Sequence, residues 1–303
     1  MRALFSKTRK VLTLAVLFLA AFANFASAFQ TDGGPTLIEF IEKRLTKLPK
    51  VNGERPAFDN ICPIGSDPIA ARVFREYGAL FAGDSSLLPP KCIFSGELEL
   101  ESYHRSLETK TAVIQGTPIA LQRKAMEKLL EAVDDAEKSG RRISPLDGPI
   151  AGKRTFADTL RIWNSRFFRA LDHWVARQKI SPRERSEAVA SPLRQQISMV
   201  VEWESKGYFF STDFSKSIFL SVAPPGTSQH LSMIAFDVVE ADDPVVRAIL
   251  NKHGWFQTIR TDEPHFTFLG VEEKELPRRG LRPLKRGSFT FWIPKLGTEP
   301  ISE

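Results

Sequence analysis

A carboxylate lies inside an apolar segment in the second half of this 303-residue chain. Asp237 interrupts the run of residues 234–239, which otherwise resembles a short buried strand. A buried carboxylate is costly unless it is paired or binds a metal ion. His230 stands seven residues earlier, after a turn segment with proline and glycine, and His265 begins a second run rich in aromatic residues. These three side chains are therefore candidates for one shared site.

Two imidazoles and one carboxylate are typical of catalytic zinc sites, which keep a fourth position for water. The metal lowers the pKa of that water, and a nearby carboxylate can take its proton as a general base. We predict one zinc ion per chain, held by His230, Asp237 and His265. Asp262, three residues before His265, is the candidate base, and Glu263 is the alternative. The pattern alone also fits a core histidine and a capping aspartate, because the chain has five histidines and 36 acidic residues.

The segment from residue 225 to 237 resembles the Ser-x-His-x-x-Gly-x-Ala-x-Asp motif of the zinc D-alanyl-D-alanine carboxypeptidases. This VanY-like family groups with the LAS metallopeptidases and phage endolysin-type peptidases. The residues that fall on the motif in register are Ser228, His230, Ala235 and Asp237. Residues 262–266 resemble the family's second motif, with an acidic residue three positions before the last histidine. The resemblance implies cleavage of peptidoglycan stem peptides, with Ser228 among the substrate-binding residues.

A third similarity lies upstream, where residues 152–166 resemble the family's Gly-Tyr-Arg-Ser element and the helix after it. The resemblance implies that Arg154 contacts the substrate and stabilises the reacting carbonyl. Arg154 also precedes the expected start of a helix, where a guanidinium and free backbone N–H groups favour a carboxylate or a developing oxyanion. Without the resemblance, a surface arginine would be the simpler interpretation. The whole resemblance covers roughly residues 117–271, where a helix, the arginine element and the two histidine motifs follow in the order of the family.

Some positions depart from the family pattern. Met233 stands where the motif has glycine, and the stretch between Arg154 and His230 is longer than the family pattern predicts. These departures keep open a zinc- or peptidoglycan-binding protein with weakened catalysis. A zinc hydrolase for another amide or an ester is a further alternative. The sequence does not decide between a carboxypeptidase and an endopeptidase.

The elements that must position these residues divide into helices first and strands later. Apolar spacing predicts helices over residues 35–48, 68–81, 117–140, 193–203 and 244–253, and a strong apolar stripe from Phe156 to Trp174. Residues 208–222 are rich in aromatic and β-branched types, and strands are expected at 234–239, 265–271 and 287–293. We therefore predict an α+β fold of helices packed on a small, mostly antiparallel sheet. The resemblance implies an LAS/Hedgehog-like peptidase fold.

The chain begins like an exported protein. Residues 1–28 combine a basic start, an apolar run and a small-x-small site at residues 26–28, which predicts a signal peptide and a mature start near Phe29. An uncleaved membrane anchor is the alternative, and no later segment is expected to cross a membrane. The predicted location is periplasmic or secreted. We further expect an N-terminal extension at 29–110, a zinc peptidase domain at 111–297 and a tail at 298–303.

Charge and cysteine content narrow the class of protein. The formal charge is +6, but four basic residues and no acidic one lie in the leader, so the rest of the chain carries only +2. This balance gives little support for nucleic-acid binding. The two cysteines, Cys62 and Cys92, are expected to form a disulfide in an oxidising compartment, and two free buried thiols are the alternative.

Overall fold

The computed structural model describes residues 34–50, 56–84 and 88–297. The predicted signal peptide and C-terminal tail lie outside the described residues. From Gly34 onward, the described residues belong to one compact unit. Within the described part of the chain, no helix is long and apolar enough to cross a membrane.

The N-terminal part is helical, and the helices expected at residues 35–48 and 68–81 are present beside two that were not predicted. Its elements are α1 (Leu37–Leu45), α2 (Phe58–Ile61), α3 (Pro68–Tyr77), the 3-10 helix η1 (Gly78–Ala82) and α4 (Glu97–Ser106). Asp67 caps α3, because its carboxylate accepts hydrogen bonds from the backbone N–H groups of Ile69 and Ala70. A disulfide joins Cys62, just after α2, to Cys92 before α4.

The helix predicted over residues 117–140 is wrong in its first part. A β-hairpin precedes it, formed by β1 (Thr109–Ile114) and β2 (Thr117–Gln122), and the helix α5 spans only Arg123–Lys138. Gln115 and Gly116 form the two-residue turn, with φ angles of 46° and 79°. Such a turn matches the twist of the paired strands, and Ile119 and Leu121 then alternate into the core. In residues 117–122, the alternation of buried and exposed side chains in a strand therefore outweighs the helical spacing that these residues share with α5.

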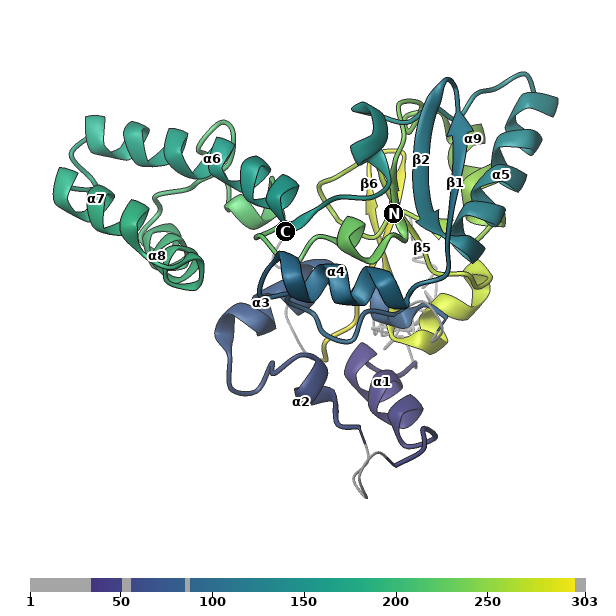
Figure 1. Cartoon of the computed structure of the whole chain (residues 1–303), viewed down its shortest axis with the longest axis horizontal. Coiled ribbons are helices and arrows are strands. Elements are labelled where there is room, and N and C mark those ends of the chain that lie inside the picture. Colours follow the sequence, from purple (N-terminus) through teal and green to yellow (C-terminus); the bar gives the residue numbers. More distant parts are fainter. Residues whose placement is uncertain (1–33, 51–55, 85–87, 298–303) are drawn as a thin grey trace, which may run out of the picture. The chain divides into compact units, whose positions relative to one another are not determined.

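The central part is a group of three helices, labelled in Figure 1. They are α6 (Phe156–Ala176), α7 (Pro182–Ala190) and α8 (Leu193–Ser205). The predicted apolar stripe of α6 is core, because Trp163, Phe167 and Leu171 are buried with residues of α8 in one hydrophobic cluster. Thr155 and Asp158 form a capping box at the start of α6. This cap sets the point where the chain leaves Arg154 and becomes helical.

Residues 208–222 form no strand, although the C-terminal part was expected to be rich in strands. Their regular element is a short 3-10 helix, η4 (Ile218–Leu220). Phe210 packs against Phe167 of α6 and Trp203 of α8, and Phe219 of η4 lies against Arg72 of α3, so both rings are buried on helices rather than in a sheet. Glu204 on α8 holds this loop by accepting hydrogen bonds from the backbone N–H groups of Phe210 and Ile218. The aromatic content therefore reflects packing onto helices and not strand pairing.

The described strands form three small antiparallel sheets, in agreement with an α+β fold. One is the β1–β2 hairpin, another is the β6–β7 hairpin (Leu281–Arg286 and Phe289–Pro294), and the third has the order β3-β5-β4 (Ala235–Asp237, His265–Phe268, Trp255–Phe256). The helix α9 (Pro244–Lys252) connects β3 to β4. Short 3-10 helices are η3 (Gly148–Ala151), η5 (Gln229–Ser232) and η6 (Glu273–Arg279). An LAS-type fold in particular stays a prediction.

One hydrophobic cluster joins the N-terminal helices to the strands that carry the candidate site. It contains Leu37 of α1 and Phe74 of α3 together with Phe236 of β3 and Phe266 of β5. The N-terminal helices and the three-stranded sheet therefore share one hydrophobic core. The domain boundary near residue 110 remains a prediction.

Candidate metal site

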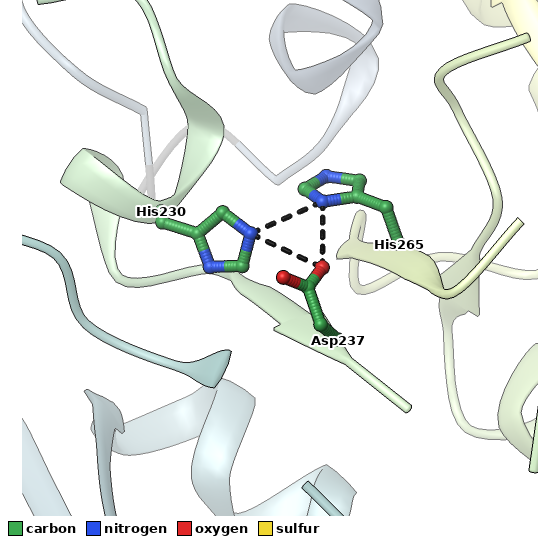
Figure 2. Close-up of side chains that lie close together, drawn as sticks. All are labelled: His230, Asp237 and His265. Carbon is green, nitrogen blue, oxygen red and sulfur yellow. Dashed lines mark hydrogen bonds and ion pairs between the residues drawn. The ribbon is translucent and has the colours of Figure 1, made fainter. Parts of the chain in front are cut away.

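His230, Asp237 and His265 meet in a triangle of ligand atoms. Nε2 of His230 lies 3.1 Å from Nδ1 of His265 and 3.2 Å from Oδ1 of Asp237. Nδ1 of His265 lies 3.1 Å from the same carboxylate oxygen. Figure 2 shows the two rings and the carboxylate pointing toward one another. The three residues predicted from the sequence to share a metal ion are therefore brought together, and their donor atoms are close enough for one ion.

The fold places these ligands through two local devices. Asp237 and His265 are directly opposite each other on the antiparallel strands β3 and β5. His230 lies on η5, which ends at Met233 in a left-handed conformation with φ of 54° before the chain enters β3. A non-glycine residue in this region costs about 1 kcal/mol. The turn brings His230 back over the strand that carries Asp237.

The hydrogen bonds of each ring define its tautomer. Nδ1 of His230 lies 2.9 Å from the carbonyl oxygen of Gly152, which can only accept, so this nitrogen carries the proton. Nε2 of His265 lies 2.9 Å from Oε1 of Gln229. The Gln229 amide is oriented because its nitrogen donates to the carbonyl oxygen of Tyr77 at 2.8 Å. Its oxygen therefore faces His265, and Nε2 of that ring carries the proton.

Two bare nitrogens consequently face each other and a carboxylate oxygen. In a neutral imidazole only one nitrogen bears hydrogen, so Nε2 of His230 and Nδ1 of His265 present lone pairs. Burial lowers the pKa of His230 from 6.5 to about 4, and the positive charge of Arg154 acts in the same direction. At neutral pH, Nε2 of His230 therefore does not carry a second proton of the ring. A bound cation satisfies all three lone pairs, and the donor set suits zinc.

The partners that orient the ligands include residues that sequence reasoning missed. Gln229 holds His265, and its oxygen also accepts a hydrogen bond from Thr267 and one at 3.3 Å from Thr258. The hydroxyl of Tyr77 donates to the carbonyl oxygen of Phe219 at 2.5 Å. Gln229 lies beside a predicted ligand, which is a usable signal. Tyr77 is 152 residues away from Gln229, and nothing local marks it.

Arg154 lies beside the candidate ligands, where it contacts Asp237. Its Nη2 donates to Oδ2 of Asp237 at 2.6 Å, and its Nε donates to the carbonyl oxygen of Ile150 at 3.1 Å. The ion pair stabilises the ionised carboxylate and leaves Oδ1 for the triangle. Nη1 of Arg154 has no hydrogen-bond partner among the described residues. The guanidinium therefore has donors left for a ligand in the adjoining pocket.

A pocket of about 500 Å³ opens onto the triangle. Its wall includes the three candidate ligands, Arg154, Ser228 and Asp262, whereas Glu263 and Met233 are not part of it. Met233 is buried, and its side chain does not occupy this pocket.

Asp262 lies on the turn into β5, since its carbonyl oxygen accepts a hydrogen bond from the backbone N–H of His265 at 3.2 Å. Its carboxylate has no hydrogen-bond partner among the residues that the structure describes. Desolvation by the surrounding protein raises the pKa of this carboxyl, and water at its exposed surface moderates the effect. A raised pKa brings a carboxylate closer to the range useful for a general base.

Two solved structures are similar to this chain. One is the D,D-pentapeptidase VanY from a VanB-type vancomycin resistance cassette, a point mutant in complex with Zn(II), with a TM-score of 0.34 and 15% identity over 62% of this chain and 90% of that chain. The other is VanYB in complex with D-alanine-D-alanine, with a TM-score of 0.36 and 15% identity over 65% of this chain and 94% of that chain. No protein-family model and no curated protein matches this chain. The functional assignment therefore rests on the motifs and geometry of the site itself.

Proposed function

We propose that this protein is a zinc-dependent peptidase of peptidoglycan stem peptides, acting as a D,D-carboxypeptidase or endopeptidase. The observation that carries the proposal is the triangle of His230, Asp237 and His265, whose bare ligand atoms face one another at the wall of a pocket. The substrate class comes from the resemblance of the motifs around these residues to those of D-alanyl-D-alanine carboxypeptidases. Export to the periplasm or outside the cell is part of the same proposal.

The site residues have distinct roles in this proposal. Zinc held by the three ligands would polarise a peptide carbonyl and lower the pKa of a bound water. Asp262, which lines the pocket, would accept a proton at its carboxylate, since this group has no hydrogen-bond partner within the described part of the chain. Arg154 would donate from Nη1 to the substrate oxygen that gains charge, while its Nη2 keeps Asp237 in place. Ser228, also in the pocket wall, would contact the peptide.

Metal content and peptide cleavage test the proposal together. The purified chain should contain about one zinc ion per molecule, as expected for a three-ligand site. It should release D-alanine or a cleaved stem peptide from peptidoglycan, and a chelator should stop the reaction. Mass analysis of the products separates a carboxypeptidase from an endopeptidase. Cleavage that is unaffected by removing zinc would contradict the metallopeptidase assignment.

Variants separate metal binding from proton transfer. His265→Ala should lose both zinc and activity, because it removes a ligand. Asp262→Asn should keep zinc and lose activity, because the amide cannot accept the proton. Glu263→Gln is the matched control, since Glu263 does not line the pocket, and it should retain activity. Full activity of the Asp262→Asn variant would rule out Asp262 as the base.

A further inference from the structure

One face of the helix α6 packs in the core, and the other lines the pocket at the metal site. Its core face consists of Trp163, Phe167 and Leu171, which are buried in the central hydrophobic cluster. Its other face lines the pocket at the metal site through Arg161, Ile162, Ser165 and Arg166. These positions follow one another at i, i+1, i+4 and i+5, so they share one side of the helix. The long segment between Arg154 and His230 therefore supplies a wall of the candidate active site.

This wall is positively charged, and of its three cations only Arg161 has a carboxylate partner among the described residues. Among the described residues, the side chain of Arg166 bonds to two hydroxyls, with Nη1 2.8 Å from Oγ of Ser165 and Nε 3.4 Å from Oγ of Ser221. Lys216, in the loop before η4, lines the same pocket. Neither Arg166 nor Lys216 forms an ion pair within the part of the chain that the structure describes. Arg161 reaches Asp158 only at 3.6 Å, and the side chain is 64% exposed.

The acidic groups of the pocket do not neutralise these cations. Asp237 is paired with Arg154 at the metal triangle, and Asp262 stands on the turn before His265. Asp147, on the loop before η3, is the remaining acidic residue of the lining. None of them is within ion-pairing distance of Arg166 or Lys216. Unpaired cations that face a shared cavity attract an anionic ligand, and an arginine fork suits a carboxylate.

We propose that the wall formed by Arg161, Arg166 and Lys216 (the basic wall) binds a carboxylate of the peptide, so that peptides with an acidic group are preferred. This inference rests on the proposed function and specifies its substrate class. The carboxylate has two sources, the free C-terminus of the peptide or an acidic side chain on either side of the cleaved bond. Both present the same chemistry to the basic wall.

The experiment uses the full-length mature protein and four synthetic peptides that end in D-alanyl-D-alanine. One pair differs only by Glu or Gln at an internal position, and the other pair differs only by a C-terminal acid or amide. Cleavage and calorimetric binding are measured for the wild type, Arg166→Gln, Lys216→Gln and the double variant. Lys179→Gln is the matched control, because this exposed lysine does not line the pocket.

Each single variant should raise KM or Kd for the acidic peptide about threefold, and the double variant about tenfold. The wild type should bind the neutral peptide of the pair more weakly than the acidic one. The variants should bind the neutral peptide as well as the wild type does. The pair that shows this loss of discrimination identifies the source of the carboxylate. Lys179→Gln should discriminate like the wild type. Raising the salt concentration should weaken binding of the acidic peptide more than that of the neutral one.

If the variants change KM or Kd equally for acidic and neutral peptides in both pairs, the basic wall does not bind the carboxylate, even if all peptides are cleaved. Cleavage of none of the peptides would contradict the proposed function instead, and calorimetry on the same peptides would then decide the basic wall alone. Absence of binding to every peptide would overturn both.

Discussion

Gln229 accepts a hydrogen bond from Nε2 of His265 at 2.9 Å, while its amide nitrogen donates to the carbonyl oxygen of Tyr77. This relay connects the helix α3 to a candidate metal ligand and determines which nitrogen of His265 faces the triangle. Outer partners of this kind orient metal-binding histidines, and their removal typically costs 10- to 100-fold in metal affinity.

Gln229→Leu should therefore weaken zinc binding by about 10- to 100-fold, because His265 loses the acceptor that selects its tautomer. Competition with a chelator of known affinity measures the effect. Gln229→Glu should lose less, since a carboxylate still accepts from His265 although it cannot donate to Tyr77. Gln196→Leu, at a glutamine that bonds Ser191 far from these ligands in the chain, is the control. Wild-type zinc affinity in Gln229→Leu would show that the relay does not orient His265.

The metal-free protein should lose stability as the pH falls from 6.5 toward 4. Burial lowers the pKa of His230 to about 4, so the unfolded chain binds a proton in this window that the folded chain does not. Stability rises with pH where the unfolded state binds more protons, and this shift corresponds to at most about 3 kcal/mol. Urea unfolding of chelator-treated protein across this range measures the slope. His230→Gln should flatten it, and an unchanged slope in that variant would contradict the assignment.

Glu204→Gln should make stability less dependent on pH. Burial raises the pKa of Glu204, although its bonds to Ser217 and to the backbone of Ile218 and Phe210 oppose this. The folded state thus holds a proton at higher pH than the unfolded state, so stabilisation present at low pH is lost as the pH rises. The variant should gain stability relative to the wild type as the pH rises from 4.5 to 8 in urea titrations. Glu202→Gln, on the exposed side of α8, should show no such gain.

Replacing both Cys62 and Cys92 by serine should destabilise the fold. The disulfide closes a segment of 30 residues, and the loss of such a cross-link costs about 3–4 kcal/mol through the entropy of the unfolded chain. The midpoint of urea unfolding measures this change. Zinc content should persist in the folded variant, because the three ligands come from other segments. Loss of zinc without a shift of the midpoint would contradict this separation.

The sequence by itself determined the chemistry of the site and the elements with regular patterns. His230, Asp237 and His265 were identifiable because imidazole and carboxylate groups are rare in apolar runs and the motif around them is local. The apolar stripe of α6 was identifiable because three- and four-residue spacing directly encodes one buried helix face, as Trp163 and Phe167 show.

Only the tertiary structure decided how distant segments complete the site. Tyr77, Gly152 and Gln229 orient the two histidines through backbone carbonyl or amide groups, and any residue type supplies a backbone carbonyl. Likewise, the hairpin before α5 and the coil at residues 208–222 depend on turn conformation and on packing against helices. The bonds that orient the histidines and the packing of residues 208–222 join segments far apart in the chain, so they leave no periodic signal in the local sequence. The hairpin is local instead, and it depends on its two-residue turn and on the alternation of the strands beside it.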